Sequence, residues 1–166
     1  MLRLALLVVT LERTSACTGE WVDSDTPTSA CTALSERDGA VLQLVMSDEF
    51  SLDGRSFADG HDSRWTAIEF APNTNAQVNY YNTSLASTED GNMVLRSTSQ
   101  DVDLPLYENT SVPETRHLQT AMVQTWNKFC FTEGAAEIRA KLPGRGSQAG
   151  LWPAFWMMGN LGRVRS

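Results

Sequence analysis

The sequence predicts an all-β fold, and three observations lead to that prediction. Short segments alternate between apolar and polar residues with a period of two, which is the spacing of side chains on a half-buried strand. Glycine, proline, asparagine and aspartate stand between these segments, as they do in tight turns. No stretch of a dozen residues shows the 3.6-residue period of an amphipathic helix. Several short strands separated by turns indicate an antiparallel sandwich or barrel.

The amino terminus has the pattern of an export signal. Residues 4–11 form an apolar run after Arg3, and residues 14–16 are small enough for a cleavage point before Cys17. Eight apolar residues are too few to cross a bilayer, which takes about 20. A buried amino-terminal strand or a truncated start is the alternative interpretation. We therefore expect residues 1–16 to be a signal peptide that directs the chain to the secretory pathway and the extracellular side.

The next segment, residues 17–40, is rich in threonine, serine, aspartate and alanine and has no sustained periodicity. This composition predicts a leader or linker. Residues 41–166 then carry the strand signals, so we expect the β-sandwich to occupy that range.

Three strands are expected in the first two thirds of that range. Val41–Met46 is a compact apolar run. Asn92–Thr98 follows an Asp-Gly pair at residues 90–91, which is a strong hairpin signal. Leu118–Trp126 alternates, with leucine, threonine, methionine and glutamine on one face and alanine and valine on the other.

The clearest strand candidate is Ala136–Leu142. Its alanine, isoleucine, alanine and leucine residues fall on one face, and Glu137, Arg139 and Lys141 fall on the other. The sequence Pro-Gly-Arg-Gly follows at once and closes the segment. We interpret Glu137 and Arg139 as a cross-strand charge pair rather than as catalytic groups.

Composition and charge exclude some classes of partner. The net charge is −7, and the 13 lysine and arginine residues form no run, so the chain lacks the basic surface that binds a phosphate backbone. Nucleic acid is therefore not an expected partner. His61 and His117 are far apart and have no obvious ligand residues beside them, so neither a metal site nor another cofactor is expected.

Two sequons and three cysteines bear on the secretory interpretation. Asn82 and Asn109 each begin an Asn-Thr-Ser tripeptide and are glycosylation candidates. The cysteines are Cys17, Cys31 and Cys130, and an odd number in a secreted chain suggests a free thiol or a partner elsewhere.

The segment GLWPAFWMMGN, residues 150–160, places Trp152 and Trp156 on one face if it is extended. Exposed indole rings are suited to stacking on sugar rings. The alternative is that one or both tryptophans fill the sandwich core, as buried aromatic residues often do. Pro153 cannot donate to a strand ladder, so it is expected at a strand start or a sheet edge.

Three ordered blocks of sequence resemble a known family. They are LVMSDEFSLDGRSFADGHDSRWTA (44–67), MVQTWNKFCFTEGAAEIRAKLPG (122–144) and GLWPAFWMMGNLGR (150–163). These blocks resemble glycoside hydrolase family 16, and within it the yeast-type β-glucan synthesis-associated branch. Residues 125–132 and 156–163 carry the branch-specific cues. The resemblance covers about residues 41–163.

The resemblance implies a concanavalin-like jelly-roll sandwich of two antiparallel sheets with a glucan cleft on the concave sheet. It also implies a retaining mechanism, in which two carboxyl groups stand about 5–5.5 Å apart. The family supplies these groups from a Glu-x-Asp-x-x-Glu strand that follows the Trp-Pro-Ala-x-Trp segment. No such motif occurs in the 166 residues, so the resemblance implies an incomplete sandwich without catalytic residues.

The resemblance also assigns candidate substrate-binding residues. Trp152 and Trp156 would be sugar-stacking residues, and Gln124 and Trp126, which share a strand face, would line the cleft floor. The partner of Cys130 would lie beyond Ser166. β-Glucan is the expected partner. Association with membranes of the secretory pathway or with the cell wall comes only through the family.

Three functions remain open from the sequence. The chain is the amino-terminal part of a β-glucan hydrolase or transglycosylase, a non-catalytic glucan-binding module, or a scaffold for wall assembly without sugar affinity. The residues present do not decide between β-1,3 and β-1,6 linkages, or between hydrolysis and transfer.

Overall fold

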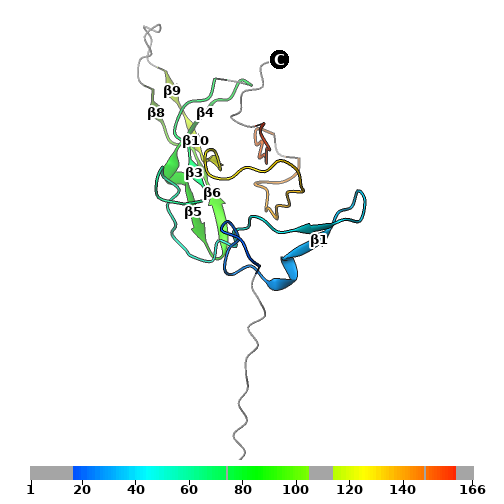
Figure 1. Ribbon diagram of the computed structural model, residues 1–166. Coiled ribbons are helices and arrows are strands. Elements are labelled where there is room, and N and C mark those ends of the chain that lie inside the picture. The colour runs from blue at the N-terminus through cyan, green and yellow to red at the C-terminus, as the bar shows by residue number, and fades with distance from the viewer. Residues whose placement is uncertain (1–16, 74, 105–113, 148, 160–166) are drawn as a thin grey trace, which may run out of the picture. The chain divides into compact units, whose positions relative to one another are not determined.

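The computed structural model describes residues 17–73, 75–104, 114–147 and 149–159, and in this part of the chain the regular elements are short strands and 3-10 turns (Figure 1). The elements are η1 (Thr28–Ala30), β1 (Thr32–Leu34), β2 (Val41–Gln43), β3 (Thr66–Ala67), β4 (Asn79–Tyr81), η2 (Thr83–Leu85), β5 (Ala86–Glu89), β6 (Asn92–Leu95), β7 (Ser97–Thr98), β8 (Val102–Asp103), β9 (Thr115–Arg116), β10 (Leu118–Thr120) and β11 (Val123–Gln124). The predicted all-β fold is confirmed, as several small sheets consistent with an incomplete sandwich. Within the described ranges, no helix is long and apolar enough to cross a membrane.

The chain divides into two compact units. The first comprises residues 1–53 and 88–93, and the second comprises residues 54–87 and 94–166. The candidate site residues that the structure describes all belong to the second unit.

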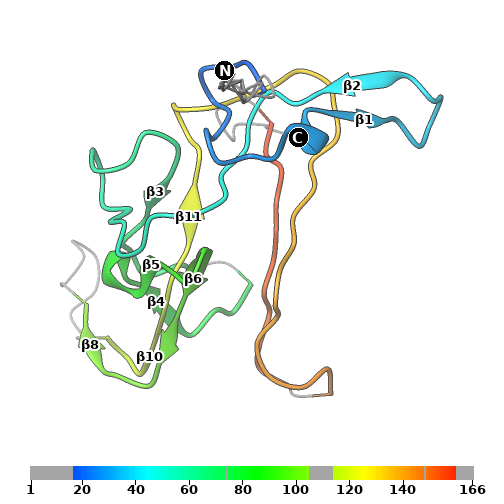
Figure 2. The same ribbon diagram turned by 90° about the horizontal axis from the view of Figure 1, so that it is seen from below.

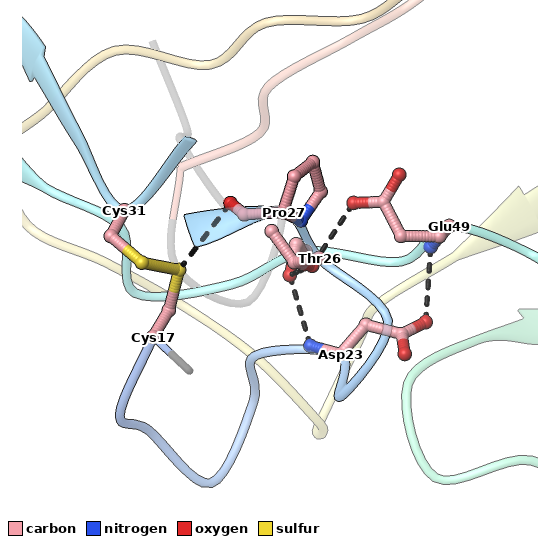
Figure 3. The surroundings of a disulfide bond; sticks show 7 residues. Cys17, Asp23, Thr26, Pro27, Cys31 and Glu49 are labelled. Atoms are coloured by element: carbon pink, nitrogen blue, oxygen red, sulfur yellow. Dashed lines mark hydrogen bonds between the residues drawn. A yellow bond between two sulfur atoms is a disulfide. The ribbon is translucent and has the colours of Figure 1, made fainter. Parts of the chain in front are cut away.

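The first unit contains the antiparallel hairpin β1–β2, in which Thr32 lies opposite Gln43 and Leu34 opposite Val41. A disulfide joins Cys17 to Cys31 just before β1 (Figure 3). The segment 17–40, for which the sequence predicts a leader or linker, therefore holds a disulfide, a 3-10 turn and a strand. The hydrophobic periodicity of the sequence does not reveal this structure, because the disulfide and polar side chains stabilise the segment and an apolar face does not.

A polar network beside the disulfide holds residues 23–26 against residues 47–49. The hydroxyl of Thr26, which is buried, donates to Glu49 Oε1 at 3.0 Å and lies 2.7 Å from the hydroxyl of Ser47 (Figure 3). The backbone amide of Glu49 donates to Asp23 Oδ2 at 3.0 Å, and the amide of Asp23 donates to Ser47 Oγ at 2.9 Å. Glu49 is thus a structural residue of this unit.

The largest sheet of the second unit has the order β4–β10–β7. The strand β10 pairs antiparallel with β7, but it pairs parallel with β4, which the antiparallel prediction did not anticipate. A parallel pair needs a long connection between its strands, and residues 82–117 provide one. Strands β8 and β9 form a separate antiparallel pair, with Val102 opposite Arg116.

A second pair, β3 with β11, lies next to the most deeply buried side chain of the described residues, Phe57. The amide of Ala67 in β3 donates to the carbonyl of Phe57 at 2.6 Å, and Ala67 is itself buried. The guanidinium of Arg55 lies 5.3 Å from the centre of the Phe57 ring. Burial of Phe57 therefore fixes the loop that leads from residue 57 into β3.

The predicted Asp-Gly turn joins β5 to β6. Asp90 has φ 50° and Gly91 has φ 67°, and positive φ at both central residues is the signature of a type I′ hairpin turn. The strand predicted over Asn92–Thr98 is present but interrupted, as β6 and β7.

The predicted strand Ala136–Leu142 is wrong. The structure has no strand over residues 136–142, and all seven side chains are exposed. Figure 2 shows this part of the chain, residues 133–159, as two extended arms that reverse near residues 144–150. The alternating pattern suits burial of one face, but a strand also needs hydrogen-bonded neighbours, and no described segment pairs with this one.

The strand predicted over Leu118–Trp126 is broken into β10 and β11, and the strand predicted over Val41–Met46 is limited to β2. In β10 the buried side chain is Gln119, which is 4% exposed, whereas Leu118 is 45% exposed. The side-chain Nδ2 of Asn82 donates to Gln119 Oε1 at 2.7 Å, and Gln119 Nε2 donates to the carbonyl of Gln100 at 3.1 Å. A side-chain amide with a hydrogen-bond partner at each end thus occupies a core position where hydropathy alone favours leucine.

Candidate functional site

A surface hollow of about 420 Å³ in the second unit contains two of the predicted substrate-binding residues, Gln124 and Trp126. The hollow lies at the pair β3–β11, which Figure 2 shows side by side. Its lining residues come from the loop before β3, from β3 itself and from the turn after β11: Asp59, Thr66, Gln124, Trp126, Asn127 and Lys128.

The register of β3 and β11 places the polar side chains together. Gln124 lies opposite Thr66, and Val123 lies opposite Ala67. Residues directly opposite in an antiparallel pair share a face of the sheet. Ala67 is buried, so the other face carries Thr66 and Gln124 to the hollow. Gln124 and Trp126 thus both line the hollow, but Trp126 belongs to the turn after β11 and does not share a strand face with Gln124.

A tight turn after β11 presents Trp126, Asn127 and Lys128. The amides of Lys128 and Phe129 both donate to the carbonyl of Thr125, at 3.0 and 3.1 Å. Asn127 has φ 59°, a left-handed conformation that asparagine tolerates better than most residues. The turn reverses the chain and leaves the Trp126 side chain 47% exposed at the hollow.

Lys128 connects this turn to the loop on the other side of the hollow. Its ammonium group donates to the carbonyl of Asp62 and to the carbonyl of Trp65, both at 2.6 Å. These contacts span more than 60 residues of sequence. Lys128 therefore holds the loop that ends at β3 beside the turn that follows β11.

The loop is braced a second time through the side chain of Asp62. Its Oδ2 accepts from Arg55 at 2.6 Å, and its Oδ1 accepts from the amides of Arg64 and Trp65 at 2.8 and 2.9 Å. Burial raises the pKa of Asp62, but the Arg55 hydrogen bond and the two backbone amides outweigh burial and lower the pKa below its ordinary value. Asp62 is therefore ionised at neutral pH.

The remaining polar side chains of the hollow are not engaged within the described part of the chain. The structure shows no hydrogen bond there from the side chains of Asp59, Thr66, Gln124 or Asn127. Together they offer a carboxylate, a hydroxyl and two amides beside an exposed indole ring. This set can donate to and accept from hydroxyl groups while an apolar face rests on the indole.

Trp152 and Trp156 lie elsewhere. They do not line the hollow, and they stand in the strand-free segment near the end of the described chain. Trp152 is 86% exposed and Trp156 is 70% exposed. The alternative in which these tryptophans fill a core is thus not the arrangement of the described structure.

The modification candidates are found in different settings. Asn82 caps η2, where its Oδ1 accepts from the amide and the hydroxyl of Ser84 at 2.9 and 2.7 Å, and its Nδ2 donates to Gln119. The side-chain nitrogen of Asn82, to which a glycan would be attached, is therefore engaged in a hydrogen bond within the structure. Asn109 lies outside the described residues. Cys130 is a free, exposed thiol, and the disulfide joins Cys17 to Cys31, a pairing that the sequence did not predict.

Sequence reasoning missed four lining residues of the hollow: Asp59, Thr66, Asn127 and Lys128. All four lie within the blocks 44–67 and 122–144, which carry the family resemblance. The sequence alone does not show that these two blocks lie side by side in the structure. Within the described ranges, no group of three histidine, cysteine, aspartate or glutamate side chains could hold a metal ion.

The chain is similar to known proteins of one family. Residues 4–165 match the profile of the family described as beta-glucan synthesis-associated protein SKN1/KRE6/Sbg1. The chain is 42% identical over 142 residues to the beta-glucan synthesis-associated protein SKN1 of Saccharomyces cerevisiae. It is 40% identical over 149 residues to the KRE6 protein of that yeast, and 38% identical over 142 residues to the KRE6 protein of Candida albicans.

These alignments cover 86%, 90% and 86% of this chain, but only 17%, 19% and 18% of the respective relatives. The chain thus spans less than a fifth of the length of the curated relatives it matches. No solved structure matches it.

Proposed function

The chain belongs to the family of beta-glucan synthesis-associated proteins, and from that premise we propose that it forms a polysaccharide-contacting part of a protein of cell-wall β-glucan synthesis. β-Glucan is the proposed ligand, and the exposed indole rings are the proposed contacts. The finer proposal is that the whole protein is a retaining glycoside hydrolase or transglycosylase of the family 16 type, acting in the secretory pathway or at the cell wall.

One observation carries the proposal: the exposure of Trp152 and Trp156, at 86% and 70%. Large aromatic side chains are costly to leave in water, and exposed clusters of them commonly mark binding sites. In an extended segment the two indoles, four residues apart, project from the same side. Indole faces can stack on the C–H faces of β-linked glucose rings, which supports a glucan as the ligand.

The proposed catalytic step is not assigned to any residue of this sequence. A retaining glycosidase uses two carboxyl groups about 5–5.5 Å apart. No Glu-x-Asp-x-x-Glu motif occurs in the 166 residues, and Glu49 serves the network of the first unit. The second candidate function is a non-catalytic glucan-binding or wall-assembly scaffold, which needs no such pair of carboxyl groups.

The test is co-sedimentation of the 166-residue chain with insoluble β-1,3-glucan and with β-1,6-glucan. The double variant Trp152→Ala, Trp156→Ala should bind at least about tenfold more weakly, since loss of two stacking contacts removes more than about 1.4 kcal/mol. Phe155→Ala is the matched control, because Phe155 is 53% exposed in the same segment but projects to the other side.

Equal binding by the double variant and the wild type would overturn the assignment of the indoles. A wild-type chain that binds neither glucan would overturn the glucan-contact proposal and favour the scaffold.

A further inference from the structure

We propose that two copies of this chain associate through residues 135–141, which pair antiparallel across a two-fold axis at Ile138. The inference is independent of the proposed function, because it concerns a surface that binds protein and needs no sugar. It assigns a partner to a segment that has the sequence pattern of a strand but no neighbouring strand in the described structure.

The backbone of residues 135–141 is free to pair with another strand. Within the described ranges, this segment belongs to no sheet, and none of its amide or carbonyl groups makes a hydrogen bond. All seven side chains are exposed, and Figure 2 shows the segment within an extended arm. Extended backbone with unpaired N–H and C=O groups is a template for a strand of another chain.

One face of the segment is apolar. Ala136, Ile138 and Ala140 project to the same side of an extended chain, and Ile138 is 57% exposed. Side chains that lie directly opposite in an antiparallel pair contact one another. With the axis at Ile138, the two Ile138 side chains contact each other, and each Ala136 lies opposite an Ala140. The dimer therefore removes apolar surface from water on both copies.

The charged face selects this register. Antiparallel registers that keep the two apolar faces together differ in which residue lies on the axis. With the axis at Ile138, Glu137 of each copy lies opposite Arg139 of the other, and no like charges are opposed. With the axis at Glu137 or Arg139, that residue meets its own copy. With the axis at Ala140, Arg139 meets Lys141 twice.

A parallel pair in register is excluded by the same charges, because Glu137, Arg139 and Lys141 would each lie opposite an identical charge. The sequence pattern of Glu137 and Arg139 indicates a cross-strand charge pair, and such a pair needs two strands. A second copy of the chain supplies the second strand.

The interface is small. Pro143 has no amide to donate, so the ladder does not extend past residue 142. A pair of seven-residue strands buries less than the roughly 1,200–2,000 Å² of a standard interface, and interfaces below that range belong to weak, reversible complexes. We therefore expect a dimer that dissociates on dilution.

The first test is sedimentation equilibrium of the 166-residue chain without sugar, over protein concentrations from about 10 µM to about 1 mM. We expect a reversible equilibrium between monomer and dimer. A chain that stays monomeric throughout would overturn the proposal, and so would association that continues beyond the dimer, since a two-fold interface closes.

The second test reverses the two charges. Glu137→Arg places the introduced arginine opposite Arg139, and Arg139→Glu places the introduced glutamate opposite Glu137. Each variant alone should dimerise at least tenfold more weakly than the wild type. An equimolar mixture of the two variants should form a heterodimer, because both cross-strand pairs are then attractive again. Homodimers of wild-type strength in both variants, or a mixture that remains monomeric, would overturn the register.

Glu133→Arg and Arg145→Glu are the matched controls. They change the net charge by the same amounts, and both residues are exposed and lie outside residues 135–141. Both should dimerise like the wild type. Equal weakening by these controls would mean that the net charge, and not the strand pair, governs association.

The third test locates the axis by oxidative cross-linking in a Cys130→Ser background, since Cys130 is a free, exposed thiol. Ile138→Cys places the introduced thiol opposite its own copy, so a covalent dimer should form readily. Ala140→Cys is the control, because residue 140 lies opposite residue 136 and the two introduced thiols are kept apart. Faster cross-linking through position 140 than through position 138 would overturn the proposed axis.

The double variant Trp152→Ala, Trp156→Ala separates this inference from the proposed function. It should dimerise like the wild type, because its indoles lie outside the paired segment. Loss of the dimer in this variant would show association through the tryptophans and overturn the inference. A chain that dimerises but does not sediment with glucan supports the inference and contradicts the proposed function, and a monomer that sediments with glucan does the reverse.

Discussion

At the scale of single residues, buried polar side chains with hydrogen-bond partners decide the local structure. Gln119 is the clearest case: it is 4% exposed, and both ends of its amide have partners, Asn82 and the carbonyl of Gln100. Burial of an amide is tolerated because these bonds replace those it would make to water. Asn82 in turn caps η2, so one side chain links a turn to the buried centre of β10.

This linkage makes the cost of Asn82→Ala predictable. The substitution leaves the buried Gln119 oxygen without its donor and removes the acceptor of the Ser84 amide, so the free energy of unfolding should fall by about 1–3 kcal/mol. Urea denaturation measures this change.

Ser84→Ala is the matched control, because it abolishes the same sequon but removes only the exposed bond from the Ser84 hydroxyl to Asn82. Ser84→Ala should lower the free energy of unfolding clearly less than Asn82→Ala does. If both substitutions lower the free energy of unfolding equally, the Asn82–Gln119 hydrogen bond does not contribute to stability.

At the scale of elements, the turn of the hairpin β5–β6 can be tested directly. Gly91→Ala places a β-carbon on a residue with φ 67°, where a side chain is strained even though no atom lies within 4 Å. The free energy of unfolding should therefore fall by about 1 kcal/mol. Gly146→Ala is the control, because its surroundings are equally open and its φ is not in the left-handed region. Identical melting of the two variants would contradict the type I′ assignment.

The same elements show which features the sequence could predict. The Asp90-Gly91 turn is a local signal and was correctly predicted. The parallel pairing of β10 with β4 and the Cys17–Cys31 bridge were not predicted, because each joins parts of the chain through contacts that leave no local pattern.

Ala136–Leu142 shows the opposite error. Its alternation is the most regular in the sequence, yet it forms no strand in the described structure. Periodicity reports which face a segment could bury, whereas strand formation also requires a neighbour with free N–H and C=O groups. Lys128 was missed for a related reason, since its role is visible only once two distant segments are seen to meet.

At the scale of the whole molecule, the described residues bury few large apolar side chains and expose many. Phe57 is the largest fully buried side chain, whereas Ile138, Leu142, Trp152 and Trp156 are all more than half exposed. Exposed apolar surface of this extent is unusual for a soluble protein and marks a site of contact with something else. The proposed function identifies β-glucan as the occupant of the tryptophan-bearing part.

The most direct test of that central claim is oxidative footprinting of the tryptophans, read by mass spectrometry, with and without soluble β-glucan. The account predicts that laminarin protects Trp152 and Trp156 several-fold, because a bound chain covers their exposed rings, while dextran does not. Trp21, in the first unit, supplies the internal reference and should be oxidised equally in every sample. Unchanged oxidation of Trp152 and Trp156 in saturating laminarin, or equal protection by dextran, would contradict the claim that this chain contacts β-glucan through its exposed indoles.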